Sequence, residues 1–115
     1  MLIQYKKDYE KTAMGLLSYL PDFKNLANLK DEMHLNQEDN SFQLYLFRDS
    51  DANIIGVIGT QKENHFIIIR YLSLAPGYRE KKYQRQILEE LIQNNPQYKI
   101  SAVPEYTYIL KLLKR

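Results

Sequence analysis

The sequence predicts one mixed α/β domain, in which helices pack against a central sheet that is largely antiparallel. Three observations carry this prediction. The spacing of apolar residues is helical towards both ends of the chain and strand-like in the middle. No linker, repeat or low-complexity segment divides the chain. A chain of 115 residues, 44% of them hydrophobic, buries about two-thirds of its surface and supports a single core, so the domain is expected to span residues 1–115.

The first third of the chain is predicted to contain a short strand and two helices. Residues 1–6 read as the strand. Apolar residues recur at spacings of three and four in the next two segments, which end near Leu20 and His34. Asp8 and Asp22 are the candidate N-caps of these two helices. A cation at the end of the second helix would be favoured by the helix dipole, which gives His34 a structural interpretation.

The middle of the chain is predicted to form a three-stranded antiparallel meander over residues 42–48, 54–60 and 65–74. The third strand has a continuous apolar centre, as expected for a strand that is covered on both faces. Gly56 and Gly59 lie inside the second strand. Such glycines mark either a bulge that shapes the sheet beside a ligand or close packing against a helix.

The last third of the chain is predicted to form a helix, a strand and a short final helix, over residues 81–94, 98–103 and 107–114. A helix between two strands of one sheet is the usual connection of a parallel pair. The strand at 98–103 is therefore expected to lie parallel to the strand that ends at residue 74.

The composition excludes several kinds of site. Zero cysteines exclude disulfides, thiolate metal sites and a cysteine nucleophile, and two distant histidines are too few for a histidine-based metal site. Because the four glycines are scattered, the chain has neither a dinucleotide fingerprint nor a Walker-type phosphate loop. We expect no metal.

Charge and hydropathy limit the partners and the location. A net charge of +2 is compatible with a small anionic ligand but is a poor footprint for a nucleic-acid binder. The apolar runs are too short to span a membrane, and the N-terminus lacks the pattern of a secretion signal. We therefore expect a cytoplasmic protein that binds neither nucleic acid nor a membrane.

Basic residues gather at the predicted start of the helix over residues 81–94. They are Arg79, Lys81, Lys82 and Arg85, with Glu80 as the single acid among them. Cations at a helix N-terminus are unfavourable by about 0.3–1 kcal/mol each, because this end carries partial positive charge. The pattern fits an anion site made by free backbone N–H groups and basic side chains. A solvated surface turn on a mildly basic protein is the alternative.

The segment Leu72-Ser73-Leu74-Ala75-Pro76-Gly77-Tyr78-Arg79, running into an amphipathic helix, resembles motif A of the GCN5-related N-acetyltransferases (GNAT). Two N-terminal strings, MLIQYKK at residues 1–7 and AMGLLSYLP at residues 13–21, resemble the RibT group of that family. Members of the RibT group are encoded in riboflavin operons of Gram-positive bacteria. The resemblance covers nearly the whole chain and implies the GNAT fold, a mixed, largely antiparallel sheet flanked by helices.

The resemblance implies acetyl-CoA as co-substrate and indicates where it would bind. In that family the pantetheine arm pairs with the backbone of the strand before the loop, which here matches Leu72 and Leu74. The backbone N–H groups of the same strand stabilise the oxyanion when an amine attacks the thioester.

In that family a loop with the pattern Arg/Gln-x-x-Gly-x-Gly/Ala holds the pyrophosphate. The pattern falls on residues 79–84, where Arg79 matches the first position. Tyr83 lies between two positions, 82 and 84, that do not match the pattern. Lys82 and Gln84 occupy places where the family has small residues that let the diphosphate approach the backbone. The ammonium of Lys82 could instead meet a phosphate as a point charge.

The resemblance implies an amine acceptor, either a small molecule or a peptide, but identifies no catalytic group. The place of the family's general-acid tyrosine falls on Lys111 or Leu112, and Tyr106 and Tyr108 lie nearby in a different register. The family's closing hairpin, which walls the acceptor site, would lie beyond Arg115. The fold is therefore expected to be shortened at its C-terminus. A homodimer partner could supply the wall; an open site or a longer chain are the alternatives.

Two functions follow from these patterns. The first is a RibT-like N-acetyltransferase that acts on an unknown amine, with a link to riboflavin biosynthesis. The second is a catalytically degenerate GNAT-fold protein that serves as a binding or regulatory module, which the departures at Lys82 and Gln84 favour. Glu63 and His65 flank a predicted turn, where a general base and plain exposed polar residues are the alternatives.

Overall fold

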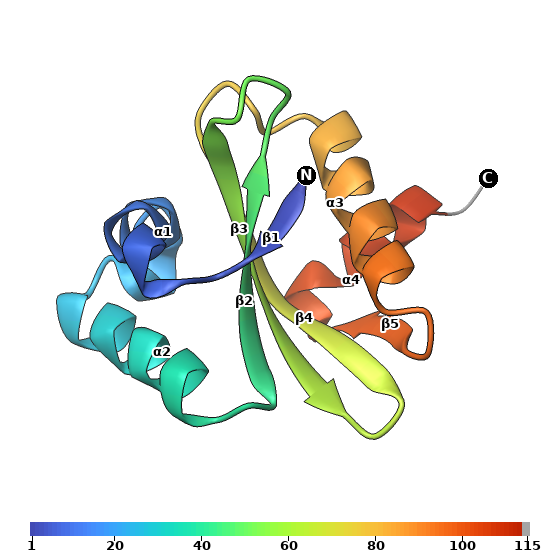
Figure 1. The fold of residues 1–115 in the computed structure, drawn as a ribbon, viewed down its shortest axis with the longest axis horizontal. Coiled ribbons are helices and arrows are strands. Elements are labelled where there is room, and N and C mark those ends of the chain that lie inside the picture. Colours follow the sequence, from blue (N-terminus) through green and yellow to red (C-terminus); the bar gives the residue numbers. More distant parts are fainter. Residues whose placement is uncertain (114–115) are drawn as a thin grey trace.

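A five-stranded mixed sheet forms the centre of the protein (Figure 1), in a computed structural model that describes residues 1–113. The strands lie in the order β1-β2-β3-β4-β5, with antiparallel pairing from β1 to β4 and parallel pairing between β4 and β5. Their bounds are β1 Leu2–Gln4, β2 Phe42–Arg48, β3 Ile54–Glu63, β4 Phe66–Leu74 and β5 Lys99–Ala102. The predicted fold class, the meander and the parallel pair are confirmed.

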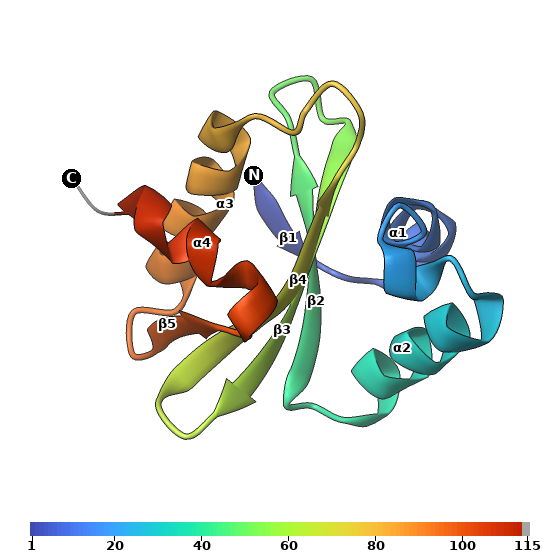
Figure 2. The same ribbon diagram turned by 180° about the vertical axis from the view of Figure 1, so that it is seen from behind.

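Helices cover both faces of the sheet (Figures 1 and 2). One face carries α1 and α2, and the other carries α3 and α4. Their bounds are α1 Glu10–Leu17, α2 Leu26–Glu38, α3 Lys81–Asn94 and α4 Thr107–Leu110. A 3-10 turn over Lys111–Leu113 follows α4, so residue 114 of the predicted last helix lies outside the described residues. No helix within residues 1–113 is long and apolar enough to cross a membrane.

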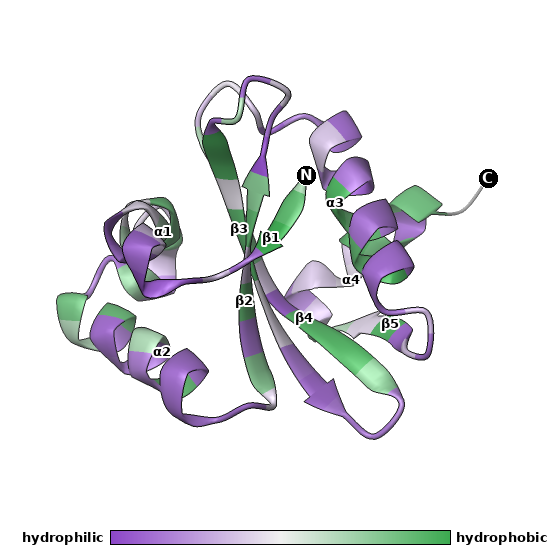
Figure 3. Cartoon of the chain, in the orientation of Figure 1, coloured by the Kyte–Doolittle hydropathy of each residue, from purple (hydrophilic) through white to green (hydrophobic). Residues whose placement is uncertain are grey.

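Two apolar cores lie on the two faces of the sheet, because successive side chains of a strand point to opposite faces. Hydrophobic residues follow the strands and the helix faces turned towards them, while the outer helix surfaces are hydrophilic (Figure 3). Fully buried members of the α3/α4 core are Ile67, Ile69, Ile87, Leu88, Leu91 and Ile109. Fully buried members of the α1/α2 core are Ala13, Leu17, Leu46 and Val57.

A bulge in β4 changes which of its side chains face which core. Gly59 of β3 pairs with Tyr71 and Thr60 pairs with Ile69, which leaves Arg70 as the extra residue. Before the bulge the odd-numbered residue Ile69 belongs to the α3/α4 core, whereas after the bulge the even-numbered Leu72 does. The alternation of β4 side chains between the two faces of the sheet therefore shifts by one residue. Pairing with β5 ends at the same place, at Ile69 and Ala102 (Figure 2).

The two strand glycines are explained by close approach to side chains of β4. A β-carbon at Gly59 would overlap the ring of Tyr71, and one at Gly56 would lie 2.7 Å from the Cδ2 atom of Leu74. A bulge is present opposite Gly59, where Arg70 of β4 is the extra residue, whereas the alternative of close packing against a helix is wrong, because the close neighbours of both glycines belong to β4.

The predicted helix caps are wrong. Asp8 lies inside a 3-10 turn that precedes α1, which then ends at Leu17 and not at Leu20. The oxygen of the Asn25 side chain caps α2, because it accepts hydrogen bonds from the N–H groups of residues 27 and 28 at 2.9 and 3.2 Å. Asp22 therefore lies in the 3-10 turn before this cap. Since α2 continues to Glu38, His34 does not close the helix.

The β3–β4 turn is tighter than predicted, because β3 continues to Glu63 and β4 begins at Phe66. Asn64 adopts a left-handed conformation with φ of 55°, which asparagine tolerates better than most residues. Glu63 and His65 are exposed at this turn, at the opposite end of β4 from Leu74. This placement agrees with plain turn residues.

Candidate functional site

The second half of β4 has an open edge on the side of β5. β3 pairs with β4 as far as Leu74, whereas β5 pairs only as far as Ile69. Side chains meet the backbone of this edge: the Nε of Arg79 donates to the Leu74 carbonyl at 2.9 Å, and the side chain of Tyr106 lies near the backbone of Leu72. Buried backbone groups need such partners. A side chain can rotate away, so the edge can accept a ligand backbone in its place.

A tight turn connects this edge to α3. The N–H of Tyr78 donates to the carbonyl of Ala75 at 3.0 Å, with Pro76 and Gly77 between them. Gly77 has φ of 90°, which suits the third position of a type II turn and which other residues rarely adopt. The turn places the start of α3 directly after the open edge.

The first turn of α3 carries the predicted anion-site residues. Glu80 is the N-cap residue but makes no side-chain cap hydrogen bond, and the first turn contains no acid. The N–H groups of Tyr83 and Gln84 donate to the Glu80 carbonyl at 3.1 and 3.5 Å. The N–H groups of Lys81 and Lys82 come before the first intrahelical hydrogen bond, so they are available to an anion together with the helix dipole.

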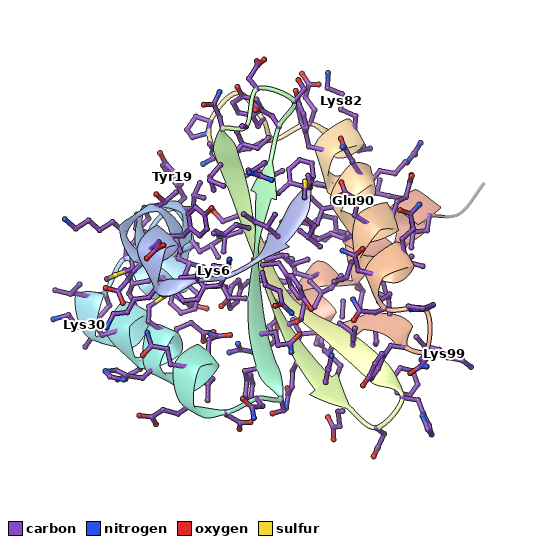
Figure 4. All side chains as sticks on the ribbon, viewed as in Figure 1. Lys6, Tyr19, Lys30, Lys82, Glu90 and Lys99 are labelled. Carbon is purple, nitrogen blue, oxygen red and sulfur yellow. The ribbon has the colours of Figure 1, made fainter. Side chains whose placement is uncertain are left out.

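Lys82 is exposed at the start of α3 (Figure 4). Its Nζ lies 3.4 Å from Glu80 Oε2 and 5.0 Å from the centre of the Tyr83 ring. The carboxylate of Glu80 raises the pKa of Lys82, which therefore stays charged. Tyr83 packs edge-to-face on Tyr78 with 5.4 Å between ring centres, and Gln84 is half-buried. The lysine thus already has an acidic partner, which an incoming phosphate would have to replace.

Arg79 links the turn to the first helix. Besides its bond to Leu74, its guanidinium carbon lies 5.1 Å from the centre of the Tyr19 ring, just after α1 (Figure 4). Leu72, Leu74 and Arg79 are therefore brought together at the end of one strand, and Lys82, Tyr83 and Gln84 lie one helical turn further on.

A cavity of about 720 Å³ lies beside the open edge, on the α1/α2 side of the sheet. Four segments wall it: residues 20–23, β3 at Gln61, the bulge of β4, and residues 103–108 before and at the start of α4. Aromatic rings and two acids dominate its lining, which includes Asp22, Phe23, Tyr71, Glu105, Tyr106 and Tyr108. Among residues 1–113, no three His, Cys, Asp or Glu side chains are grouped to hold a metal ion.

Tyr106 connects the cavity to the open edge, because it lines the cavity and lies near the backbone of Leu72 on the edge. Burial raises the pKa of Tyr106, and the nearby Tyr108, Asp22 and Glu105 raise it further, while the backbone of Leu72 lowers it. The net shift is upward, so the hydroxyl keeps its proton at neutral pH and can donate it.

The chain matches no protein-family model. It is 36% identical, over 92 residues, to an uncharacterised N-acetyltransferase encoded in the lysA 3′ region of Bacillus methanolicus. The match covers 79% of this chain and 76% of that protein. The chain belongs to the GCN5-related N-acetyltransferase family.

Solved GNAT structures share the fold of the chain. A chimera of the Vibrio cholerae spermidine N-acetyltransferase SpeG with hSSAT superimposes with a TM-score of 0.72 at 14% identity, covering 97% of this chain and 76% of that one. A GNAT acetyltransferase of Staphylococcus aureus gives 0.66 at 19% identity, covering 84% and 66%. SpeG in complex with CoA and spermine gives 0.63 at 14% identity, covering 83% and 62%.

In this GNAT chain the bulge of β4 is held by a buried ionic network that the sequence analysis missed. Glu32 of α2 is 6% exposed, and its carboxylate accepts two hydrogen bonds from Arg70, at 2.7 and 2.8 Å. The hydroxyl of Tyr71 donates to the same carboxylate at 2.6 Å, and so does the amide of Asn36. A glutamate on a polar helix gives no signal of burial, because its partners lie 38 and 39 residues further along the chain.

The network shifts the titration of its members. Burial alone would raise the pKa of Glu32, but the hydrogen bonds from Arg70 and Tyr71 and the Arg70 charge outweigh it and lower the pKa. Burial and the Glu32 carboxylate raise the pKa of Tyr71 well above 10. The carboxylate is therefore ionised and the tyrosine neutral throughout the neutral range.

We expect the stability of the protein to fall at acid pH through Glu32. Its pKa is lower in the folded than in the unfolded chain, so its contribution is complete above the unfolded value near 4.5 and is lost as the pH falls through the folded value. Urea unfolding between pH 3 and pH 7 measures this. A Glu32→Gln variant should have a smaller loss of free energy of unfolding over the acid range, and an unchanged slope would contradict the assignment.

Proposed function

We propose that the chain transfers an acetyl group from acetyl-CoA to a primary amine. The observation that carries the proposal is the continuous path from the open edge of β4, through the Gly77 turn, to the uncapped start of α3. The edge would take the pantetheine arm at Leu72 and Leu74, and the helix start would take the diphosphate. SpeG, a fold neighbour, has been solved with CoA, which supports the use of an acyl-CoA.

In the reaction, the amine nitrogen attacks the thioester carbonyl, the new C–N bond forms and the C–S bond breaks. The nitrogen loses one proton, and the leaving CoA thiolate takes one. The backbone N–H groups of the edge stabilise the oxyanion. The Tyr106 hydroxyl lies near Leu72 and keeps its proton at neutral pH, which supports it as the donor to the thiolate.

Departures from the family's pyrophosphate-loop pattern favour a second candidate function, a GNAT-fold module that binds its ligand without catalysis. Lys82 and Gln84 carry long side chains at positions where the family has small residues, and neither Lys111 nor Leu112, at the place of the family's general acid, is a tyrosine. Lys82 is already paired with Glu80. A protein that binds CoA but acetylates none of the amines offered would fit this candidate.

We expect acetyl-CoA and CoA to bind in calorimetric titrations, and Arg79→Ala and Lys82→Glu to weaken binding about tenfold or more. The reason is that a hydrogen bond to a charged group contributes about 1.5–3 kcal/mol, and 1.4 kcal/mol is tenfold in affinity. Lys99→Glu is the matched control, because Lys99 is exposed at the start of β5, away from Lys82 (Figure 4).

Two outcomes would contradict parts of this proposal. If neither ligand gives heat at millimolar concentration, the acetyltransferase function is wrong. If both bind but Arg79→Ala and Lys82→Glu bind as the Lys99→Glu control does, the diphosphate lies elsewhere.

The RibT resemblance supports an acceptor from riboflavin biosynthesis, and the polyamine N-acetyltransferases among the fold neighbours support a small amine. Adjacency of the gene to riboflavin genes would favour an acceptor from riboflavin biosynthesis. A homodimer that completes the acceptor wall is part of the same proposal, and sedimentation of the free protein tests it.

A further inference from the structure

We propose that the acceptor carries a second cationic group, which Asp22 and Glu105 bind in the 720 Å³ cavity beside the open edge. The substrate class is therefore an aliphatic diamine or a longer polycation. This inference rests on the proposed function, because the cavity and the acetyl-CoA edge share Tyr106.

The charge of the cavity supports a cation. Asp22 comes from the 3-10 turn before α2 and Glu105 from the 3-10 turn before α4, so two segments far apart in the chain bring carboxylates to one cavity. Arg70 also lines the cavity, but its guanidinium is paired with the Glu32 carboxylate by two hydrogen bonds. Once this pair is counted as neutral, the cavity retains two negative charges.

Asp22, Glu105 and Tyr106 line the same cavity, which brings both carboxylates to its reacting end. Burial is the main cause of the raised pKa of Tyr106, and the two acids raise it further, in agreement with this placement. A cation held between them would therefore lie near Tyr106, while the second amine of the same molecule reaches the edge at Leu72.

Aromatic rings form the remaining wall and suit an aliphatic chain with charged ends. Phe23 packs edge-to-face on Tyr71 with 5.3 Å between ring centres, and Tyr106 stacks on Tyr108 at 6.1 Å. Tyr108 is 51% exposed, so a ring face remains available for contact. Ring faces attract ammonium groups, and ring carbons pack against methylene groups.

A diamine also fits the proton balance of the transfer. Only the attacking nitrogen must be neutral, and the proton it loses equals the one that the CoA thiolate takes. The second nitrogen remains an ammonium, which is the form the two carboxylates bind. A monoamine has no charge left for them once its nitrogen is neutral.

The test compares 1,4-diaminobutane with butylamine, which has the same chain and one charge fewer. Binding to the free protein is followed by NMR of the tyrosine rings, and turnover is followed with acetyl-CoA. We expect the diamine to bind about tenfold more tightly, since its additional ammonium forms exposed ion pairs with both carboxylates and each pair adds a small factor. In Asp22→Asn/Glu105→Gln this preference should fall to about one. The control variant Asp31→Asn/Glu89→Gln removes two exposed carboxylates outside the cavity and should keep the preference.

The outcomes separate this inference from the proposed function. Equal affinity for the two amines, no binding of either, or a preference that survives in Asp22→Asn/Glu105→Gln overturns the cation site. If acetyl-CoA binds and butylamine is acetylated as efficiently as the diamine, the transferase function stands and the inference fails. If the diamine binds with the expected preference but acetyl-CoA does not bind, the cation site stands and the proposed function fails.

Discussion

Glu32→Ala is expected to lower the free energy of unfolding by about 3–5 kcal/mol, because removing one partner of a buried ion pair leaves the other charge uncompensated. Here the loss would strand the Arg70 guanidinium and the Tyr71 hydroxyl, both of which donate to the Glu32 carboxylate. Domains of this kind have a total stability of about 5–15 kcal/mol, so the variant would be partly unfolded at mild temperature. Urea unfolding followed by circular dichroism measures the change.

Glu38→Ala is the matched control, since Glu38 lies on the same helix with its side chain 79% exposed. It should change stability by less than about 0.5 kcal/mol. The variant Glu32→Met/Arg70→Met/Tyr71→Phe removes both charges of the buried ion pair and the tyrosine hydroxyl, and it should recover much of the loss, because no buried charge is left unpaired. A Glu32→Ala protein as stable as Glu38→Ala would show that the network does not hold the bulge.

Gly59→Ala is expected to destabilise the protein by about 1–3 kcal/mol, as is typical of an overpacked core. The new β-carbon would overlap the ring of Tyr71 on the paired strand. That ring cannot move freely, because its hydroxyl is bonded to Glu32 and its edge packs on Phe23. We therefore expect the strain to reach the bulge and to reduce acetyl-CoA binding as well as stability.

Gly15→Ala is the control for the glycine change, because nothing lies within 4 Å of a β-carbon at Gly15 in α1. This substitution should stabilise the protein by up to about 1 kcal/mol, since alanine is the better helix former. A double-mutant cycle between Gly59→Ala and Tyr71→Leu should show a coupling of roughly 1 kcal/mol or more, because the smaller side chain relieves the overlap. Additive effects would contradict the close contact.

The element order was predictable because it depends on local patterns. The α3 bounds were predicted without error, since Ile87, Leu88 and Leu91 form a stripe with helical spacing. The caps were not, because Asp22 and Asn25 are both good cap residues and only the path of the chain after Pro21 decides between them. Likewise β3 extends past Thr60 because it pairs with Ile67 and Phe66, which its own residues do not reveal.

Some residues of the candidate site were predictable from the sequence, and others were revealed only by the structure. The basic residues around Arg79 and Lys82 were visible as an unusual charge pattern at a helix start. The register of Tyr106 in the sequence does not match the family's tyrosine, yet in the structure its side chain lies near the backbone of Leu72 and lines the cavity. Asp22 and Glu105, 83 positions apart by their numbers, gave no signal of a shared cavity.

The sequence by itself determined the mixed fold, the strand that leads into α3 and the basic start of that helix, because the periodicity of apolar residues and the local charge pattern involve only neighbouring residues. Only the tertiary structure decided where β4 parts from β5, which carboxylate neutralises Arg70 and which acids line the cavity. These features depend on strand register at the Arg70 bulge and on contacts such as Glu32–Arg70 between segments far apart in the chain. Packing sets such contacts, and no local pattern in the chain encodes them.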